Sequence, residues 1–277
     1  MRTPMIAGNW KLHKTLDEAT ALVSELMPAI AGNNQVEIVV APVFTALHKV
    51  AEAISGSNIK LAAQNCCAEA QGAFTGEVSA LLLKDVVCQY VIIGHSERRQ
   101  LFGETDEAIN RKAHAVAEAG LGTILCIGET LEERESDSTL DVLRRQVRFA
   151  LRNLSTEQMA HVVIAYEPVW AIGTGVTASN EQAQEAHAFV RALVGELYDQ
   201  ATAVAIRILY GGSVKPDNAA ELLRVPDVDG ALVGEVTFLR KPRPRVTCRA
   251  LLLPPAKEEV VTTSPAAAPR AYRTGSR

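Results

Sequence analysis

One carboxylate stands at the end of an apolar run, where a catalytic base could be held. Residues 162–165 are all apolar, Tyr166 and then Glu167 come next, and Pro168 follows. Proline fixes its own φ and biases the residue before it toward extended geometry. Trp170 supplies apolar surface for a covering loop, and Gly173 allows a tight tip close to a ligand. The arrangement is typical of a base on a strand end beneath a mobile lid, although an ordinary turn after a strand is the alternative.

Five other short segments place polar residues or glycines where apolar runs end. They are Asn9-Trp10-Lys11, Ala63-Gln64-Asn65, Gly94-His95-Ser96-Glu97-Arg98-Arg99, Cys126-Ile127-Gly128-Glu129 and Tyr210-Gly211-Gly212-Ser213-Val214. Taken singly, each has a structural explanation: a surface lysine, a buried histidine satisfied by backbone, or a plain turn. Ser96 can open a short helix, whose N-terminus favours neutral imidazole at His95. The glycines at 211 and 212 let amide groups approach an anion closely.

Apolar runs alternate with helical patterns along the chain. The expected strands are residues 4–8, 36–41, 59–63, 90–94, 122–127, 161–166, 205–210 and 230–234. Thr15 with Glu18 and Ser179 with Gln182 form capping boxes, and Pro216 suits a first helical turn. Eight such units at this length predict a single (β/α)8 TIM barrel. A doubly wound sheet is disfavoured because no G-x-G-x-x-G follows the first strand.

The predicted barrel gives the motif positions a common location. Asn9, Lys11, His95 and Glu167 all fall at or just after the carboxyl ends of expected strands. In this architecture those ends form one face, and catalysis takes place there. Residues distant in sequence are therefore expected to converge.

The six segments, in this order, resemble the triosephosphate isomerase family, most closely over residues 1–234. The resemblance implies cofactor-free and metal-free interconversion of dihydroxyacetone phosphate and D-glyceraldehyde 3-phosphate, through an enediolate, in glycolysis and gluconeogenesis. It implies that Glu167 is the base, that neutral His95 and Lys11 stabilise the enediolate, and that closure of residues 168–178, the lid segment, excludes water. The substrate-binding residues it implies are Asn9, Lys11, Gly173, Ser213, Gly234 and Glu235. The supporting residues it implies are Glu97, Tyr210, Gly211 and Gly212.

The resemblance also implies a cytoplasmic homodimer. The loop at residues 71–79 places Phe74 among small and polar residues. In the family this loop inserts into a second subunit, where the residue matching Thr75 approaches Asn9 and Lys11. Packing of Phe74 under its own barrel is the alternative.

The sequence departs from the family at its C-terminal end. The family has two glycines at the end of the eighth strand, whereas this chain has Gly234 followed by Glu235. Two like charges about 5 Å apart repel by roughly 3 kcal/mol at an effective dielectric constant of about 20. Residues 246–253 are expected to be a short remnant of the last barrel helix, so the barrel domain spans residues 1–253. Residues 254–277 read as a disordered tail because of their proline, threonine and alanine content.

Two other functions stay open from the sequence. An isomerase of a four-carbon ketose phosphate would use the same proton-transfer residues with a changed phosphate site. A barrel that has lost catalysis through its altered C-terminus is the second, and intact Lys11, His95 and Glu167 argue against it.

Bulk composition agrees with a soluble enzyme. The chain has 277 residues and a net charge of −4, which favours neither nucleic acid nor an anionic membrane as a partner. The N-terminal sequence shows neither a signal peptide nor a transmembrane span. Five cysteines without a C-x-x-C pair predict reduced thiols. The remaining histidines show no zinc-ligand spacing.

Overall fold

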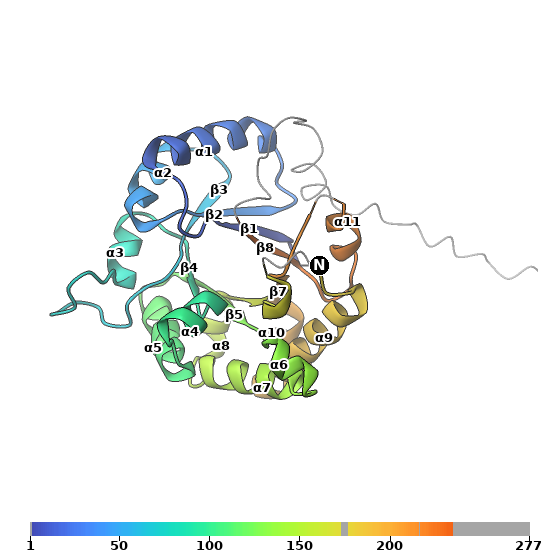
Figure 1. Ribbon diagram of the computed structural model, residues 1–277. Helices are drawn as coiled ribbons and strands as arrows, with labels where there is room; N and C mark the ends of the chain where they lie inside the picture. The colour runs from blue at the N-terminus through green and yellow to red at the C-terminus, as the bar shows by residue number, and fades with distance from the viewer. Residues whose placement is uncertain (1, 173–176, 216, 235–277) are drawn as a thin grey trace, which may run out of the picture.

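The computed structural model describes residues 2–172, 177–215 and 217–234. Within them, parallel strands follow one another around a closed barrel, and β8 pairs with β1 to complete it (Figure 1). The strands are β1 (Met5–Asn9), β2 (Glu37–Ala41), β3 (Ile59–Ala63), β4 (Tyr90–Ile93), β5 (Gly122–Ile127), β6 (Val162–Tyr166), β7 (Arg207–Tyr210) and β8 (Gly230–Gly234). The predicted (β/α)8 barrel is therefore confirmed, and the doubly wound sheet is excluded.

Helices surround the barrel and cover the outer face of the strands (Figure 1). Those in the described residues are α1 (Leu16–Ile30), η1 (Phe44–Ala46), α2 (Leu47–Ala53), α3 (Ala80–Asp85), α4 (Ser96–Phe102), α5 (Asp106–Glu118), α6 (Leu131–Glu135), α7 (Thr139–Ala150), α8 (Thr156–Met159), η2 (Val169–Ala171), α9 (Asn180–Leu197), α10 (Gln200–Ala205) and α11 (Ala219–Leu222). The capping boxes predicted at Thr15 and Ser179 both form. Pro216, predicted to open a helix, lies outside the described residues.

The strands are apolar on both faces because both faces are buried. Met5 and Ala7 of β1 belong to the cluster that fills the barrel, and Ile6 between them packs in the layer beneath the helices. Burying one such aliphatic side chain contributes about 1.5–3 kcal/mol. The near-continuous apolar runs are therefore a direct consequence of this two-layered core.

The register of the strands brings their carboxyl ends to one level. Asn9 at the end of β1 pairs with Ala41 of β2 and with Gly234 of β8. Tyr166 at the end of β6 pairs with Tyr210 at the end of β7. The β4 strand ends one residue before the prediction because Gly94 turns away at a φ of +69°. The residues that follow these strands therefore share one rim.

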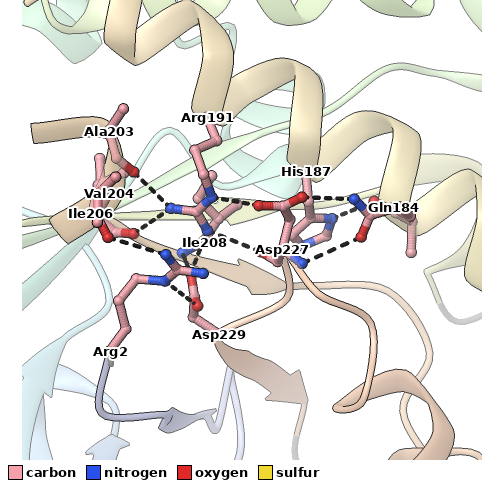
Figure 2. Close-up of polar contacts among 11 residues, drawn as sticks. Arg2, Gln184, His187, Arg191, Ala203, Val204, Ile206, Ile208, Asp227 and Asp229 are labelled. Carbon is pink, nitrogen blue, oxygen red and sulfur yellow. Dashed lines mark hydrogen bonds and ion pairs between the residues drawn. The ribbon is translucent and has the colours of Figure 1, made fainter. Parts of the chain in front are cut away.

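A polar network closes the opposite end of the barrel (Figure 2). Arg191 of α9 forms ion pairs with Asp227 at 2.6 Å and with Asp229 at 2.7 Å. Arg2 reaches the other oxygen of Asp229 at 2.5 Å. Arg191 also donates to the carbonyl oxygens of Ala203 and Ile206 around the end of α10. This network joins the chain before β1, the helices before β7 and the start of β8.

Several predictions from the sequence lie outside the described residues. They are the lid tip at Gly173, the carboxylate Glu235, the helix remnant at residues 246–253, and the tail at residues 254–277. The domain boundary after residue 253 stays a prediction for the same reason.

Candidate active site

Glu167 lies directly after β6 and is buried, with 2% of its surface exposed. Its backbone amide donates to the Ile127 carbonyl of β5 at 2.7 Å, which continues the strand pairing by one residue. One carboxylate oxygen accepts a hydrogen bond from the Ser96 amide at 2.9 Å. The other lies 3.0 Å from Nε2 of His95. The barrel therefore brings together two residues that are 72 positions apart in the printed sequence.

His95 occupies the N-cap of α4, as the predicted short helix requires. Its Nδ1 accepts a hydrogen bond from the Glu97 amide at 3.2 Å. A nitrogen that accepts a hydrogen bond carries no proton, so the ring proton resides on Nε2 and points at Glu167. This arrangement fixes the tautomer and corresponds to neutral imidazole.

For both His95 and Glu167, burial and the neighbouring groups shift the pKa in opposite directions. Burial lowers the pKa of His95, but the adjacent Glu167 carboxylate raises it, and the net direction is upward. Burial raises the pKa of Glu167, but His95 and the Ser96 amide lower it, and the net direction is downward. Glu167 is therefore a buried, ionised carboxylate, stabilised by its contacts with His95 and the Ser96 amide.

Lys11 is held in the site by its backbone as well as by its charge. Its amide donates to the Asn9 side chain at 3.0 Å, and its carbonyl accepts from Gln64 at 2.9 Å. Its φ of +52° is uncommon for a residue with a side chain, and such strain costs about 1–3 kcal/mol. The Lys11 ammonium pairs with Glu97 at 2.6 Å. Asn9, Gln64 and Glu97 thus position a single positive charge at the rim.

The first part of the lid segment rests on Glu129. This fully buried carboxylate accepts from the Trp170 indole at 2.8 Å and from the Tyr166 hydroxyl at 3.1 Å. Arg134 balances its charge at 3.1 Å. At the other end of the lid segment, the Ala178 amide donates to the Tyr210 hydroxyl at 3.3 Å. Tyr210 at the end of β7 therefore contacts the lid segment directly, whereas Tyr166 at the end of β6 is linked to it through Glu129.

Glycines form the wall of the site beside Glu167 and Lys11. A Cβ at Gly211 would lie 2.8 Å from the Glu167 side chain, and one at Gly212 would lie 2.9 Å from the Pro168 ring. A Cβ at Gly234 would lie 3.8 Å from the Lys11 side chain. Ser213 follows the first two glycines and is partly exposed. Close approach of backbone is therefore required at Gly211 and Gly212, whereas Gly234 is at ordinary contact distance.

The structure brings most of the residues named from the sequence to one rim. Asn9, Lys11, His95, Glu97 and Glu167 are linked by the contacts above, whereas Gly173 and Glu235 lie outside the described residues. Asn65 is an exception among the motif residues, because it accepts a hydrogen bond from Lys112 at 2.7 Å and serves a buried polar cluster. Three further residues support the site through contacts that the sequence does not predict. Gln64 donates to the Lys11 carbonyl, the Ser96 amide donates to Glu167, and Glu129 accepts from Trp170 of the lid segment.

The described residues were also compared with the requirements of a metal site and of a membrane span. They contain no group of three or more His, Cys, Asp or Glu side chains placed to bind a metal ion. None of their helices has both the length and the apolar character needed to cross a bilayer.

Comparison with known proteins agrees with this geometry. The family model described as triosephosphate isomerase matches residues 4–241. Curated triosephosphate isomerases from Pelobacter propionicus and Syntrophotalea carbinolica are each 62% identical over 234 residues, covering 84% of this chain and 93% of the relative. The triosephosphate isomerase of Trichlorobacter lovleyi is 58% identical over the same share of each chain.

Proposed function

The chain belongs to the triosephosphate isomerase family, and we propose that Glu167, His95 and Lys11 carry its reaction. The activity is the interconversion of dihydroxyacetone phosphate and D-glyceraldehyde 3-phosphate, a step of glycolysis and gluconeogenesis. The observation that supports the assignment best is the buried Glu167 carboxylate, 3.0 Å from His95 Nε2. Assay of the purified chain with glyceraldehyde 3-phosphate tests the activity, and a four-carbon ketose phosphate run in parallel tests its selectivity.

Glu167 is the base. It removes a proton from the carbon next to the carbonyl and returns it to the neighbouring carbon. To reach a substrate, the carboxylate leaves the Ser96 amide and His95, whose contacts lower its pKa. Burial then raises the pKa against weaker opposition, with the Lys11 charge still lowering it, which makes the carboxylate a stronger base when substrate is present.

His95 and Lys11 stabilise the negative charge that develops on the substrate oxygens. His95 acts as neutral imidazole, since the Glu97 amide occupies Nδ1. Its Nε2 proton moves to the carbonyl oxygen, and Nε2 then accepts the proton of the neighbouring hydroxyl. Lys11 adds a positive charge that attracts the anionic substrate. Glu97 positions both groups.

The substrate phosphate binds between the ends of β7 and β8. Gly211 and Gly212 leave room for an anion, Ser213 adds a donor, and Gly234 lies beside the Lys11 side chain. Asn9, Gly173 and Glu235 complete the substrate-binding set proposed from the sequence. Tyr210 stabilises the closed lid through its hydroxyl, a role supported by its contact with the Ala178 amide.

The chain works as a cytoplasmic homodimer. The segment between β3 and α3 projects beyond the outline of the barrel (Figure 1), and 47% of the Phe74 surface on it is exposed. Leu81 and Leu82 of the following helix are also exposed, by 52% and 56%. Apolar surface of this kind supports an isologous contact with a second copy. The described cysteines are all free thiols, which is consistent with a reducing compartment.

A further inference from the structure

Gln146 of α7 makes an unusual pair of contacts with a single residue of the active-site rim. It is buried, with 4% of its surface exposed. Its Oε1 accepts a hydrogen bond from the Gly128 amide at 2.8 Å, and its Nε2 donates to the Gly128 carbonyl at 3.0 Å. The side chain thereby satisfies both backbone groups of a residue just beyond the end of β5.

Gly128 in turn packs directly against the backbone of Glu167. A Cβ at Gly128 would lie 1.7 Å from the Glu167 carbonyl oxygen and 2.7 Å from its carbonyl carbon. No side chain separates the two peptide units, so a shift of one displaces the other. Ile127, the preceding residue, accepts the Glu167 amide hydrogen bond.

The residue after Gly128 contacts the start of the lid segment. The Glu129 carbonyl accepts from the Val169 amide at 3.1 Å, and its carboxylate accepts from Trp170. Three consecutive residues, 127–129, therefore contact the backbone of the base and the first residues of the lid segment.

Gly128 and Gln146 also line an open pocket. It has a volume of about 460 Å³, and its lining includes Ser96 and Val169. The two hydrogen bonds from Gln146 give Gly128 directional support beside this open space.

We propose that Gln146 is a positioning residue for catalysis, acting through Gly128 on the Glu167 backbone. The proposal rests on the assignment of Glu167 as the base. Gln146 touches no reacting atom; it fixes where the base begins its movement toward substrate. Misplacement of a reacting group by about 1 Å can cost roughly a hundredfold in rate.

The test replaces Gln146 by methionine, which has a similar length and neither donor nor acceptor. The matched control is Asn110→Leu. Asn110 is a buried amide on α5 that also makes two hydrogen bonds, at 3.0 Å each, to Ala150 and Arg152 at the end of α7. Both variants should unfold at lower temperature. Only Gln146→Met should lower kcat, by about tenfold to a hundredfold, with KM within about twofold of the parent.

A primary isotope effect distinguishes misplacement of the base from a general loss of stability. With dihydroxyacetone phosphate deuterated at the reacting carbon, the effect on kcat should be larger in Gln146→Met than in Asn110→Leu, because proton transfer limits the rate more strongly. Gln146→Glu keeps an acceptor for the Gly128 amide and should lose less kcat than Gln146→Met. It also serves as the test variant if the methionine protein does not fold.

Glu167→Asp, assayed alongside, distinguishes failure of the positioning role of Gln146 from failure of the assignment of Glu167 as the base. If Glu167→Asp is impaired while Gln146→Met matches Asn110→Leu in kcat and isotope effect, the positioning role is wrong and the base assignment stands. If Glu167→Asp turns over normally, the base assignment is wrong, and the proposal for Gln146 fails with it.

Discussion

The Glu167 carboxylate lies 3.0 Å from Nε2 of His95, and its second oxygen accepts the Ser96 amide hydrogen bond. Both contacts depend on the reach of the full glutamate side chain from the end of β6. Glu167→Asp retracts the carboxylate by one methylene and should lower kcat by about a hundredfold or more, with little change in the unfolding temperature. Steady-state kinetics and thermal unfolding check this outcome. Glu181→Asp, in the exposed first turn of α9, is the control, and near-normal turnover in Glu167→Asp would exclude its role as the base.

His187 of α9 should make stability depend on pH. Burial lowers its pKa to about 4 in the folded protein, against 6.5 as its ordinary value. The unfolded chain takes up a proton as the pH falls through 6.5, and the folded protein does so only near 4. Stability contributed by the neutral form is therefore complete above pH 6.5 and decreases as the pH falls toward 4, by roughly 3 kcal/mol.

His187→Gln should flatten the fall in unfolding free energy across that pH range, as measured by denaturant titration. His161→Gln, at an exposed position before β6, is the control and should keep the slope of the parent. Equal slopes in the parent and His187→Gln would mean that the imidazole is charged or solvated in the folded protein.

Phe74 should be needed for assembly. The parent chain is expected to have twice the monomer mass by light scattering at micromolar concentration. Phe74→Ala should shift the equilibrium toward monomer, since truncation of a large apolar contact at an interface commonly costs about 2 kcal/mol or more. Phe149→Ala removes a phenylalanine of α7 that is 37% exposed, compared with 47% for Phe74, and should leave the mass unchanged. A monomeric parent chain would refute the dimer.

Glu235 should weaken substrate binding. The sequence places its carboxylate next to Gly234, whose Cα faces Lys11 across the site. Glu235→Gly should lower KM and leave kcat near its starting value, the pattern of restored uniform binding. The change should shrink at high salt, because partly exposed charges are screened over about 8–10 Å. An unchanged KM at low salt would show that the side chain points away, and inactivity of both forms would favour the catalytically impaired barrel.

The fold could be predicted almost entirely from local patterns. Runs such as residues 122–127 read as buried strands because both of their faces are covered, and Thr15 and Ser179 mark helix starts through their own hydrogen bonds. Strand ends were predicted less accurately, because β1, β2, β4 and β6 differ from their expected bounds by one residue and β7 begins two residues later than expected. Gly94 belongs to the connection after β4, and Ile206 belongs to the connection before β7. An apolar run in the sequence does not mark where a strand ends and a connection begins.

The site was predictable where chemistry requires particular residue types. Lys11, His95 and Glu167 were identified by charge, motif and position at strand ends. Contacts made by Ser96, Gln64 and Gln146 were not, because they join segments far apart in the chain. Ser96 acts through a backbone amide, which every residue except proline carries, and a buried amide side chain such as Gln146 has no periodic signal.

Helix α9 connects the two ends of the barrel. Its N-cap, Ser179, follows Ala178, which is bound to Tyr210 beside the active site, and Arg191 farther along the helix holds the network at the opposite end. Eighteen residues of helix span roughly 27 Å. Deleting one residue between Ser179 and Arg191 would rotate one attachment by about 100° relative to the other. The spacing between Ser179 and Arg191 is therefore fixed by both attachments, and insertions or deletions that loops would tolerate are excluded between them.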